Sequence, residues 1–119
     1  MKPIAVLVSL ALAIPSLAAP SQAPQAPPAT HYAIVVTGSE LLAGAYADGH
    51  THFLTRTLRP LGLECVGSIC VDDKRPDLQA ALGFAAGRAP LVIVTGGLGP
   101  TDNDITREAL SAFTGIELK

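Results

Sequence analysis

A glycine-rich segment at residues 95–101, Thr-Gly-Gly-Leu-Gly-Pro-Thr, has the residue types that best suit binding of an anion. Gly96, Gly97 and Gly99 lack a Cβ atom, so their backbone is able to adopt positive φ angles or to approach a bound group closely. Successive N–H groups in such a turn form an anion-binding concavity, and a helix that follows adds its free N–H groups. The segment predicts a phosphate-binding turn, with a plain connection as the alternative.

Polar residues after this turn suit either helix capping or metal binding. Thr101 is placed to cap the following helix, with Asp104 at capping-box spacing, and Thr106 is an alternative cap. Asp102 and Asp104 also stand beside the anion site, where carboxylates repel a phosphate unless a cation such as Mg²⁺ intervenes. They are therefore either solvated residues at a helix start or, together with Asp73, candidate ligands of a metal ion.

Glu40 ends a Thr-Gly-Ser-Glu turn at residues 37–40. A carboxylate at this point suits hydrogen bonds from the amino or hydroxyl groups of a ligand, or a charge at a helix start. His50 and His52 do not predict a metal site, because residues two apart on a helix point in nearly opposite directions. Both are interpreted as solvated or hydrogen-bonded histidines. No serine-hydrolase or P-loop nucleophile motif accompanies these residues.

These candidate residues follow apolar runs that alternate with helical patterns. Strands are expected at residues 32–36, 63–71 and 91–95. Helices are expected from Asp48 to Gly62, from Pro76 to Gly87, and from the glycine-rich turn to Gly115. Since the strands are too apolar to face water on either side, the pattern predicts an α/β fold with a parallel sheet between helices. Ligands bind such sheets beyond the carboxyl ends of the strands, where the candidate residues stand.

Two cysteines, Cys65 and Cys70, fall in the second predicted strand. An offset of five residues places them on opposite faces of a regular strand. This spacing favours two small, buried apolar side chains over an internal disulfide.

The overall charge excludes a nucleic-acid surface. The formal net charge is −2 and only 15% of the residues are charged. The cations are scattered, with Lys74 and Arg75 as the only adjacent pair, whereas phosphate backbones are bound by grouped cations.

The N-terminus has the features of a secretory signal peptide at residues 1–18: Lys2, an apolar run and a small-residue cleavage site at Ala18. An uncleaved membrane anchor is the alternative, but the run is short for a spanning helix. Residues 19–30 are rich in Pro and Ala and predict an extended linker. We therefore expect an exported protein, periplasmic or secreted, with no stable membrane span after cleavage and a globular domain at residues 31–119.

The combined motifs resemble those of a known family. They are TGSELLAG at residues 37–44, VDD at 71–73 and TGGLGPTDNDITREAL at 95–110. Together they are similar to the molybdopterin-binding domains of the MoaB/Mog type, and the GLGPT form is most similar to the N-terminal domain of the CinA proteins. The resemblance implies a three-layer α/β/α fold that binds a pterin or nucleotide pyrophosphate across the strand ends.

The resemblance also implies site residues and a chemistry. Asp73 and Asp104 match the acidic pair expected to be catalytic and to bind metal. The residues expected to bind the ligand are Gly38, Ser39, Glu40, Gly96, Gly97, Gly99, Thr101 and Thr106. The implied chemistry is Mg²⁺-dependent and acts on a phosphoanhydride, either ADP-ribose hydrolysis or adenylylation of molybdopterin. A non-catalytic exported binding module and a truncated, inactive family member are the alternatives. The expected partners are a small phosphorylated ligand and further copies of the chain.

The sequence departs from the family pattern at three places. Residues 48–50 are Asp-Gly-His where the family usually has Asp-Thr-Asn, and residues 102–104 are Asp-Asn-Asp instead of Pro-Asp-Asp. The family domain also continues beyond the point that corresponds to Lys119. We therefore expect the chain to represent the N-terminal portion of such a domain.

Overall fold

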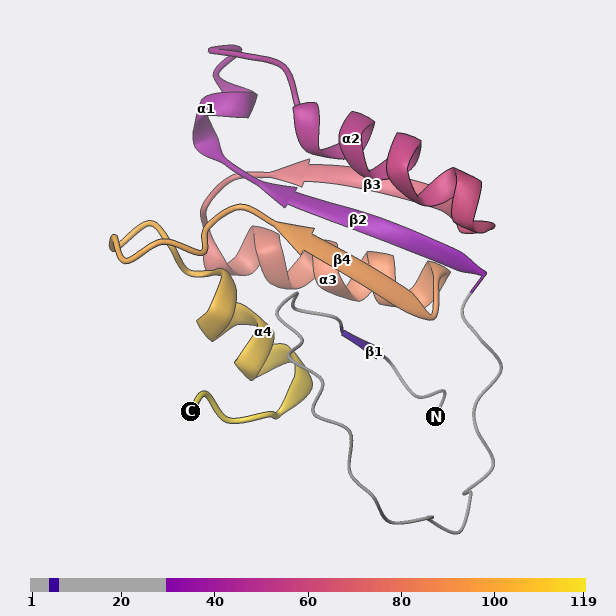
Figure 1. Ribbon diagram of the computed structural model, residues 1–119. Helices are drawn as coiled ribbons and strands as arrows, with labels where there is room; N and C mark the ends of the chain where they lie inside the picture. The colour runs from indigo at the N-terminus through magenta and orange to yellow at the C-terminus, as the bar shows by residue number, and fades with distance from the viewer. Residues whose placement is uncertain (1–4, 7–29) are drawn as a thin grey trace, which may run out of the picture.

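The computed structural model describes residues 5–6 and 30–119 and shows helices on both faces of a parallel sheet (Figure 1). The strands are β1 (Ala5–Val6), β2 (His31–Thr37), β3 (Glu64–Val71) and β4 (Leu91–Thr95). The helices are α1 (Ser39–Leu42), α2 (Gly49–Leu58), the 3-10 helix η1 (Arg59–Leu61), α3 (Arg75–Arg88) and α4 (Thr106–Thr114). The three strands expected from the sequence are confirmed, and so is the α/β fold with three layers.

The sheet has the order β1-β4-β2-β3, and every pair of neighbouring strands is parallel. Strand β2 is central, and its residues from Tyr32 to Thr37 are buried. Strand β1 pairs with Leu91 and Val92 of β4. The sequence did not predict this fourth strand, because Ala5 and Val6 fall in the segment expected to be a signal peptide.

Two apolar clusters lie on opposite faces of the sheet. On one face, Tyr32, Ile34 and Val36 pack against Leu54 and other residues beneath α2. On the other face, where Figure 1 shows α3 and α4, a larger cluster joins β2 and β4 to these two helices. Helix α3 contributes its buried stripe to this second cluster: Leu78, Ala81, Leu82 and Ala85. The sheet, covered by helices on both faces, brings the carboxyl ends of β2, β3 and β4 together at one edge.

A β-bulge overturns the prediction that the two cysteines lie on opposite faces. Tyr32 pairs with Cys65 but Ala33 pairs with Gly67, so Val66 is an extra residue in β3. The extra residue reverses the alternation of side chains beyond it, and Cys65 and Cys70 both pack on the α2 side. Both thiols are free, as expected, since five residues of strand separate them by roughly 15 Å.

The end of α3 and the start of α4 differ from the sequence prediction. Helix α3 passes through Gly87 and ends at Arg88, because Ala89 is the first residue with an extended backbone. Helix α4 begins at Thr106 instead of near Thr101. The intervening residues form a separate turn, in which the N–H of Asp104 donates to the carbonyl of Thr101 at 2.9 Å.

The N-terminal predictions lie almost entirely outside the described residues. The expected signal peptide at residues 1–18 overlaps them only at Ala5–Val6, and the expected linker at 19–30 only at Thr30. Signal cleavage and export therefore stay predictions. In the ranges 5–6 and 30–119, no helix is both long enough and apolar enough to cross a membrane.

Candidate functional site

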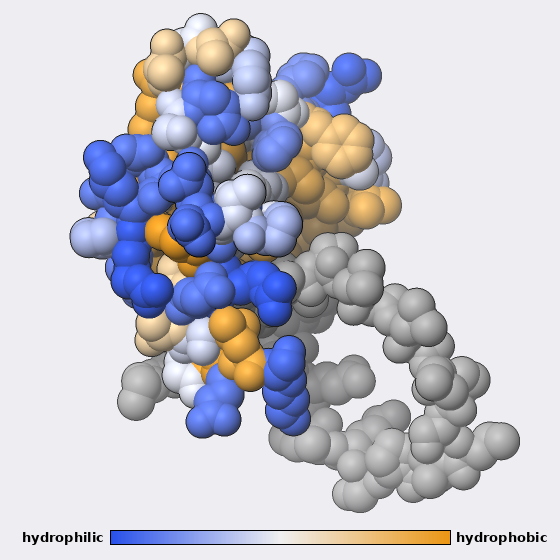
Figure 2. Space-filling model, turned by 90° about the vertical axis from the view of Figure 1, so that its left-hand side faces the viewer, coloured by the Kyte–Doolittle hydropathy of each residue, from blue (hydrophilic) through white to orange (hydrophobic). Residues whose placement is uncertain are grey.

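A cavity of about 290 Å³ lies where the carboxyl ends of β2, β3 and β4 meet. Eight of the ten predicted site residues line it: Gly38, Ser39, Glu40, Asp73, Gly96, Gly97, Thr101 and Asp104. The surface on this side of the molecule is largely hydrophilic, with small apolar patches (Figure 2). A larger cavity of about 620 Å³ lies at the opposite end of the strands and contains none of these residues. We take the smaller cavity as the candidate site because the predicted residues converge there.

Asp73 links the end of β3 to the end of β2 by hydrogen bonds. It follows β3, and its Oδ1 accepts a hydrogen bond of 2.6 Å from the hydroxyl of Thr37 at the end of β2. Its Oδ2 accepts a hydrogen bond of 3.0 Å from the N–H of Ser39 in the first turn of α1. Asp73 therefore fixes where the 37–40 segment enters the cavity.

The glycine-rich turn has the left-handed backbone that its sequence predicts. Gly96 and Gly97 have φ angles of 89° and 60°. The start of α4 is fastened to the same turn, because Thr106 donates its N–H to the carbonyl of Gly97 and its hydroxyl to that of Gly96. Thr106 is fully buried. It thus supports the turn from behind and does not line the cavity, contrary to its predicted place among ligand contacts.

Asp104 holds the outer part of the glycine-rich loop. Its Oδ2 accepts the N–H of Thr101 at 3.0 Å and also a short hydrogen bond from the Thr101 hydroxyl. The hydrogen bond from the Thr101 side chain is the main reason that the pKa of Asp104 lies below its usual value. A Cβ at Gly99 would press on the carboxylate of Asp104. Gly99 therefore leaves room for Asp104 without lining the cavity itself.

Glu40 faces the cavity from α1 and is paired with a tyrosine. The hydroxyl of Tyr46 donates to Oε1 of Glu40 at 3.1 Å, and this hydrogen bond raises the pKa of Tyr46. Both side chains line the cavity. Tyr46 could not be predicted as a site residue, because it enters the site from an irregular connection and not from a strand end.

His50 enters the site from the start of α2, where Asp48 is the N-cap. Asp48 accepts the N–H groups of His50 and Thr51 at 3.0 and 3.2 Å, and the hydroxyl of Thr51 at 2.6 Å. The ring of His50 then reaches β4, with 2.8 Å between its Nδ1 and the Thr95 hydroxyl. The prediction of a hydrogen-bonded histidine is confirmed, but its place in the cavity was not foreseen.

We expect replacement of Asp48 by alanine to destabilise the domain by about 1 kcal/mol at neutral pH, as for other lost N-caps. Burial raises the pKa of Asp48, but the hydrogen bonds from Thr51 and His50 outweigh it, so the pKa is lowered. The stabilisation is therefore present above the unfolded pKa of about 4 and is lost as the pH falls through the lower folded pKa.

Thermal unfolding at several pH values tests this expectation. The difference in melting temperature between wild type and Asp48→Ala should shrink below about pH 4. Asp48→Asn is the matched control, since asparagine caps a helix without a charge and should not reproduce that acid dependence. A constant difference between wild type and Asp48→Ala down to pH 2 would contradict the role of the Asp48 charge.

Cys70 is not suited to act as a nucleophile in this site. Burial raises the pKa of its thiol, and the negative charges of Asp48, Asp73 and Glu40 raise it further. A raised pKa keeps the sulfur protonated, whereas the thiolate is the reactive form. The groups that line the cavity are instead carboxylates, hydroxyls, an amide, one histidine and backbone atoms.

The donor set fits a metal ion that arrives with a phosphate. Within residues 5–6 and 30–119 there is no group of three or more His, Cys, Asp or Glu residues that could hold a metal. Both oxygens of Asp73 and one oxygen of Asp104 already accept hydrogen bonds from the protein. Mg²⁺ often binds with only one or two carboxylates when phosphate oxygens and water supply the other ligands. Asp73 and Asp104 would hold such an ion.

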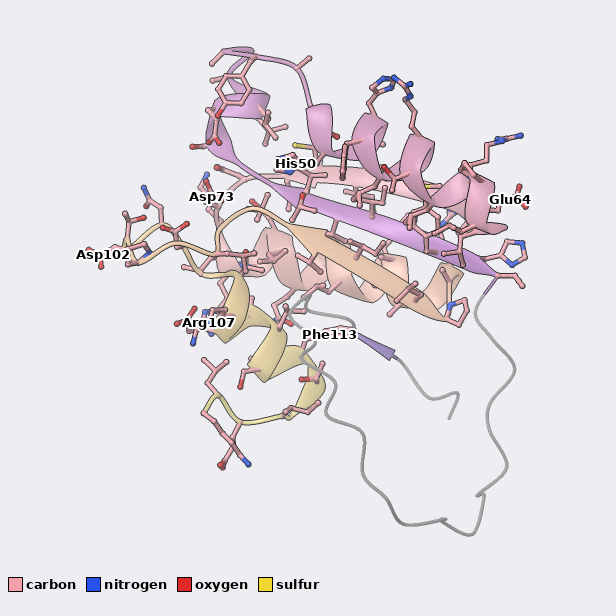
Figure 3. All side chains as sticks on the ribbon, in the orientation of Figure 1. His50, Glu64, Asp73, Asp102, Arg107 and Phe113 are labelled. Atoms are coloured by element: carbon pink, nitrogen blue, oxygen red, sulfur yellow. The ribbon has the colours of Figure 1, made fainter. Side chains whose placement is uncertain are left out.

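Asp102 does not belong to the site. It is exposed at the tip of the loop that leads to α4, away from Asp73 and His50 (Figure 3). It is absent from the lining of the cavity, whereas its neighbours Thr101, Asn103 and Asp104 are present. Of the two readings of Asp102, the structure favours a solvated residue.

With this fold and this site, the chain belongs to the molybdopterin-binding domain family. The family model described as "Probable molybdopterin binding domain" matches residues 33–119. That range contains each of the three strand ends and every residue of the cavity.

The relatives and structural neighbours agree with this membership. A CinA-like protein from Anaeromyxobacter sp. (strain Fw109-5) is 42% identical over 89 residues, which are 75% of this chain and 22% of that protein. The crystal structure of CinA from Thermoplasma acidophilum matches with a TM-score of 0.72 at 27% identity, over 76% of this chain and 54% of that one. The tungsten cofactor synthesizing protein MoaB from Pyrococcus furiosus matches with a TM-score of 0.65 at 29% identity, over 73% and 54% of the two chains. The chain thus spans about a fifth of that curated relative and half of those solved chains.

Proposed function

We propose that the domain binds a molybdopterin- or nucleotide-type diphosphate at the cavity between the strand ends and acts on its phosphoanhydride with Mg²⁺. One observation carries this proposal: a left-handed Gly96–Gly97 turn opens into the same cavity as Asp73 and Asp104. Such a turn suits phosphate oxygens, and the two carboxylates suit a cation between those oxygens and the protein.

Some residues of the cavity bind the ligand itself, and others bind the Mg²⁺ that balances the negative charge of its phosphates. The backbone of Gly96 and Gly97 faces the phosphate, while the 38–40 segment and Tyr46 offer polar groups to the pterin or nucleoside part. Mg²⁺, when bound, stabilises negative charge that develops on the phosphate oxygens. ADP-ribose hydrolysis and molybdopterin adenylylation both take place at a phosphoanhydride, and either reaction suits this arrangement.

Replacing Asp104 by asparagine tests the enzymatic form of the proposal. We expect the wild type to hydrolyse ADP-ribose in the presence of Mg²⁺. The turnover rate of Asp104→Asn should be about 100-fold lower, because a neutral amide is a far weaker Mg²⁺ ligand. EDTA should abolish the wild-type turnover. The reaction is measured by chromatography, as the release of AMP and ribose phosphate.

Asp102→Asn is the matched control, since it removes a carboxylate from the same loop but outside the cavity. Its turnover should equal that of the wild type. Unchanged turnover in Asp104→Asn would contradict the assignment of Asp104.

A non-catalytic binding module is the second candidate function. It is favoured by the hydrogen bonds within the protein that already occupy Asp73 and Asp104. Calorimetry separates the two candidates: binding of ADP-ribose without turnover, with or without Mg²⁺, supports the module. Export of the protein, predicted from residues 1–18, suits such a module, because ATP and molybdopterin are cytoplasmic.

A further inference from the structure

His50 is held in the cavity by two contacts made from different sides. Its backbone N–H donates to Oδ1 of Asp48 at 3.0 Å, which fixes the start of α2. Its ring nitrogen Nδ1 lies 2.8 Å from the hydroxyl of Thr95 at the end of β4. Figure 3 shows His50 between α2 and the ends of the strands, on the same side of the molecule as Asp73. The contact with Thr95 thus places Nδ1 of the ring against the end of β4.

The second ring nitrogen, Nε2, is available to a ligand. The structure gives it no hydrogen-bond partner within residues 30–119, although the side chain lines the cavity and is exposed. When the Thr95 hydroxyl donates to Nδ1, the imidazole proton is on Nε2, and Nε2–H is then a donor. In this tautomer the ring offers a hydrogen to the cavity.

The charged side chains that line the cavity beside His50 are all acidic. Glu40 on α1, Asp73 after β3 and Asp104 in the glycine-rich loop all line the cavity, and no Lys or Arg does. Asp48 at the start of α2 adds a further carboxylate next to His50. An anionic ligand therefore meets three carboxylates, and among the lining residues in the described part of the chain His50 is the only one with a basic side chain.

We propose that His50 binds an anionic oxygen of the ligand's phosphate group through Nε2–H, with Thr95 as the positioning residue behind it. This inference rests on the proposed function, because it names the side chain that recognises the anion in that cavity. His50 selects ligands with a phosphate or pyrophosphate over their uncharged counterparts. The glycine-rich turn binds the anion through the backbone, and His50 adds a side-chain contact in the same cavity.

Two substitutions separate the two nitrogens of the ring. An asparagine amide reaches about as far as Nδ1, whereas a glutamine amide reaches about as far as Nε2. His50→Asn therefore keeps a partner for Thr95 but loses the contact with the ligand, and His50→Gln keeps a donor at the ligand. His52→Asn is the matched control, since His52 is exposed on the same helix and does not line this cavity.

Calorimetric titration with ADP-ribose and with inorganic pyrophosphate tests the inference on the full chain. We expect His50→Asn to bind both probes about tenfold more weakly, as for loss of one hydrogen bond to a charged group. His50→Gln should stay within about threefold of the wild type, and His52→Asn should equal it. All variants should melt at the wild-type temperature, because both histidine side chains are exposed.

The outcomes distinguish this inference from the proposed function. If the wild type binds the probes and His50→Asn binds them equally well, the role of His50 is wrong and the proposed function stands. If His50→Gln weakens binding as much as His50→Asn does, Nε2 is not the contact and the inference is also wrong. If the wild type binds neither probe, the proposed function fails, and the inference fails with it.

Discussion

Replacement of Gly96 by alanine is expected to destabilise the domain by roughly 3 kcal/mol or more, a large share of the stability of a typical small domain. Gly96 has a φ angle of 89°, which an L-residue with a side chain rarely adopts. A Cβ there would also collide with the backbone carbonyl of Thr37 on the neighbouring strand. Backbone atoms cannot move aside as a side chain does, so β4 would have to separate from β2 at its carboxyl end.

Urea and thermal unfolding, followed by circular dichroism, measure this effect. Gly83→Ala is the matched control, because Gly83 is exposed within α3 and a Cβ there meets nothing within 4 Å. That substitution should stabilise the domain by about 0.5–1 kcal/mol, as expected for a glycine in a helix interior. Equal unfolding midpoints for wild type and Gly96→Ala would show that the turn does not have the conformation described above.

Replacement of Asp73 by alanine is expected to have the largest effect on the site itself. Thr37 is only 4% exposed, and its hydroxyl would lose its acceptor, while the N–H of Ser39 would lose its partner as well. Loss of a buried partner costs about 1–3 kcal/mol, and the 37–40 segment would no longer be fixed. We therefore expect both a lower melting temperature and a loss of at least about 100-fold in affinity for ADP-ribose in the presence of Mg²⁺.

Two further variants separate the causes of that loss. Asp73→Asn keeps one acceptor oxygen but no charge, so its melting temperature should fall less than that of Asp73→Ala, while its affinity with Mg²⁺ falls nearly as far. Asp77→Asn removes a carboxylate in the first turn of α3, outside the cavity, and should leave affinity unchanged. Wild-type affinity in Asp73→Ala would contradict the placement of the ligand between the strand ends.

The sheet and its layers could be predicted because their signals are local. The apolar runs at β2 and β4 predict strands of a parallel sheet, and Gly62 ends the α2–η1 segment in the left-handed conformation that its position suggests. The convergence of Asp73 with the 38–40 segment follows as well, since parallel strands end at the same edge. These features depend on residue type and period alone.

Other parts of the site depend on contacts between distant segments. The start of α4 is set by Thr106, whose hydroxyl and N–H bond to Gly96 and Gly97, and no local pattern shows those bonds. His50 belongs to the cavity only because α2 packs so that the ring meets Thr95, 45 residues further along the chain. Tyr46 likewise lines the cavity, where its hydroxyl donates a hydrogen bond to Glu40. Sequence patterns place elements, but they do not say which surfaces of those elements face a common space.

The bulge in β3 also determines how the strand tolerates a change in length. Val66 is the extra residue, with Cys65 paired to Tyr32 before it and Gly67 paired to Ala33 after it. Deleting Val66 would join these two stretches into a regular ladder and leave each remaining side chain on its present face. Deleting a residue beyond Gly67 would instead turn the rest of the strand over, exchanging its inward and outward residues. Strand β3 thus carries one removable position, and it lies at the end of the sheet remote from the site.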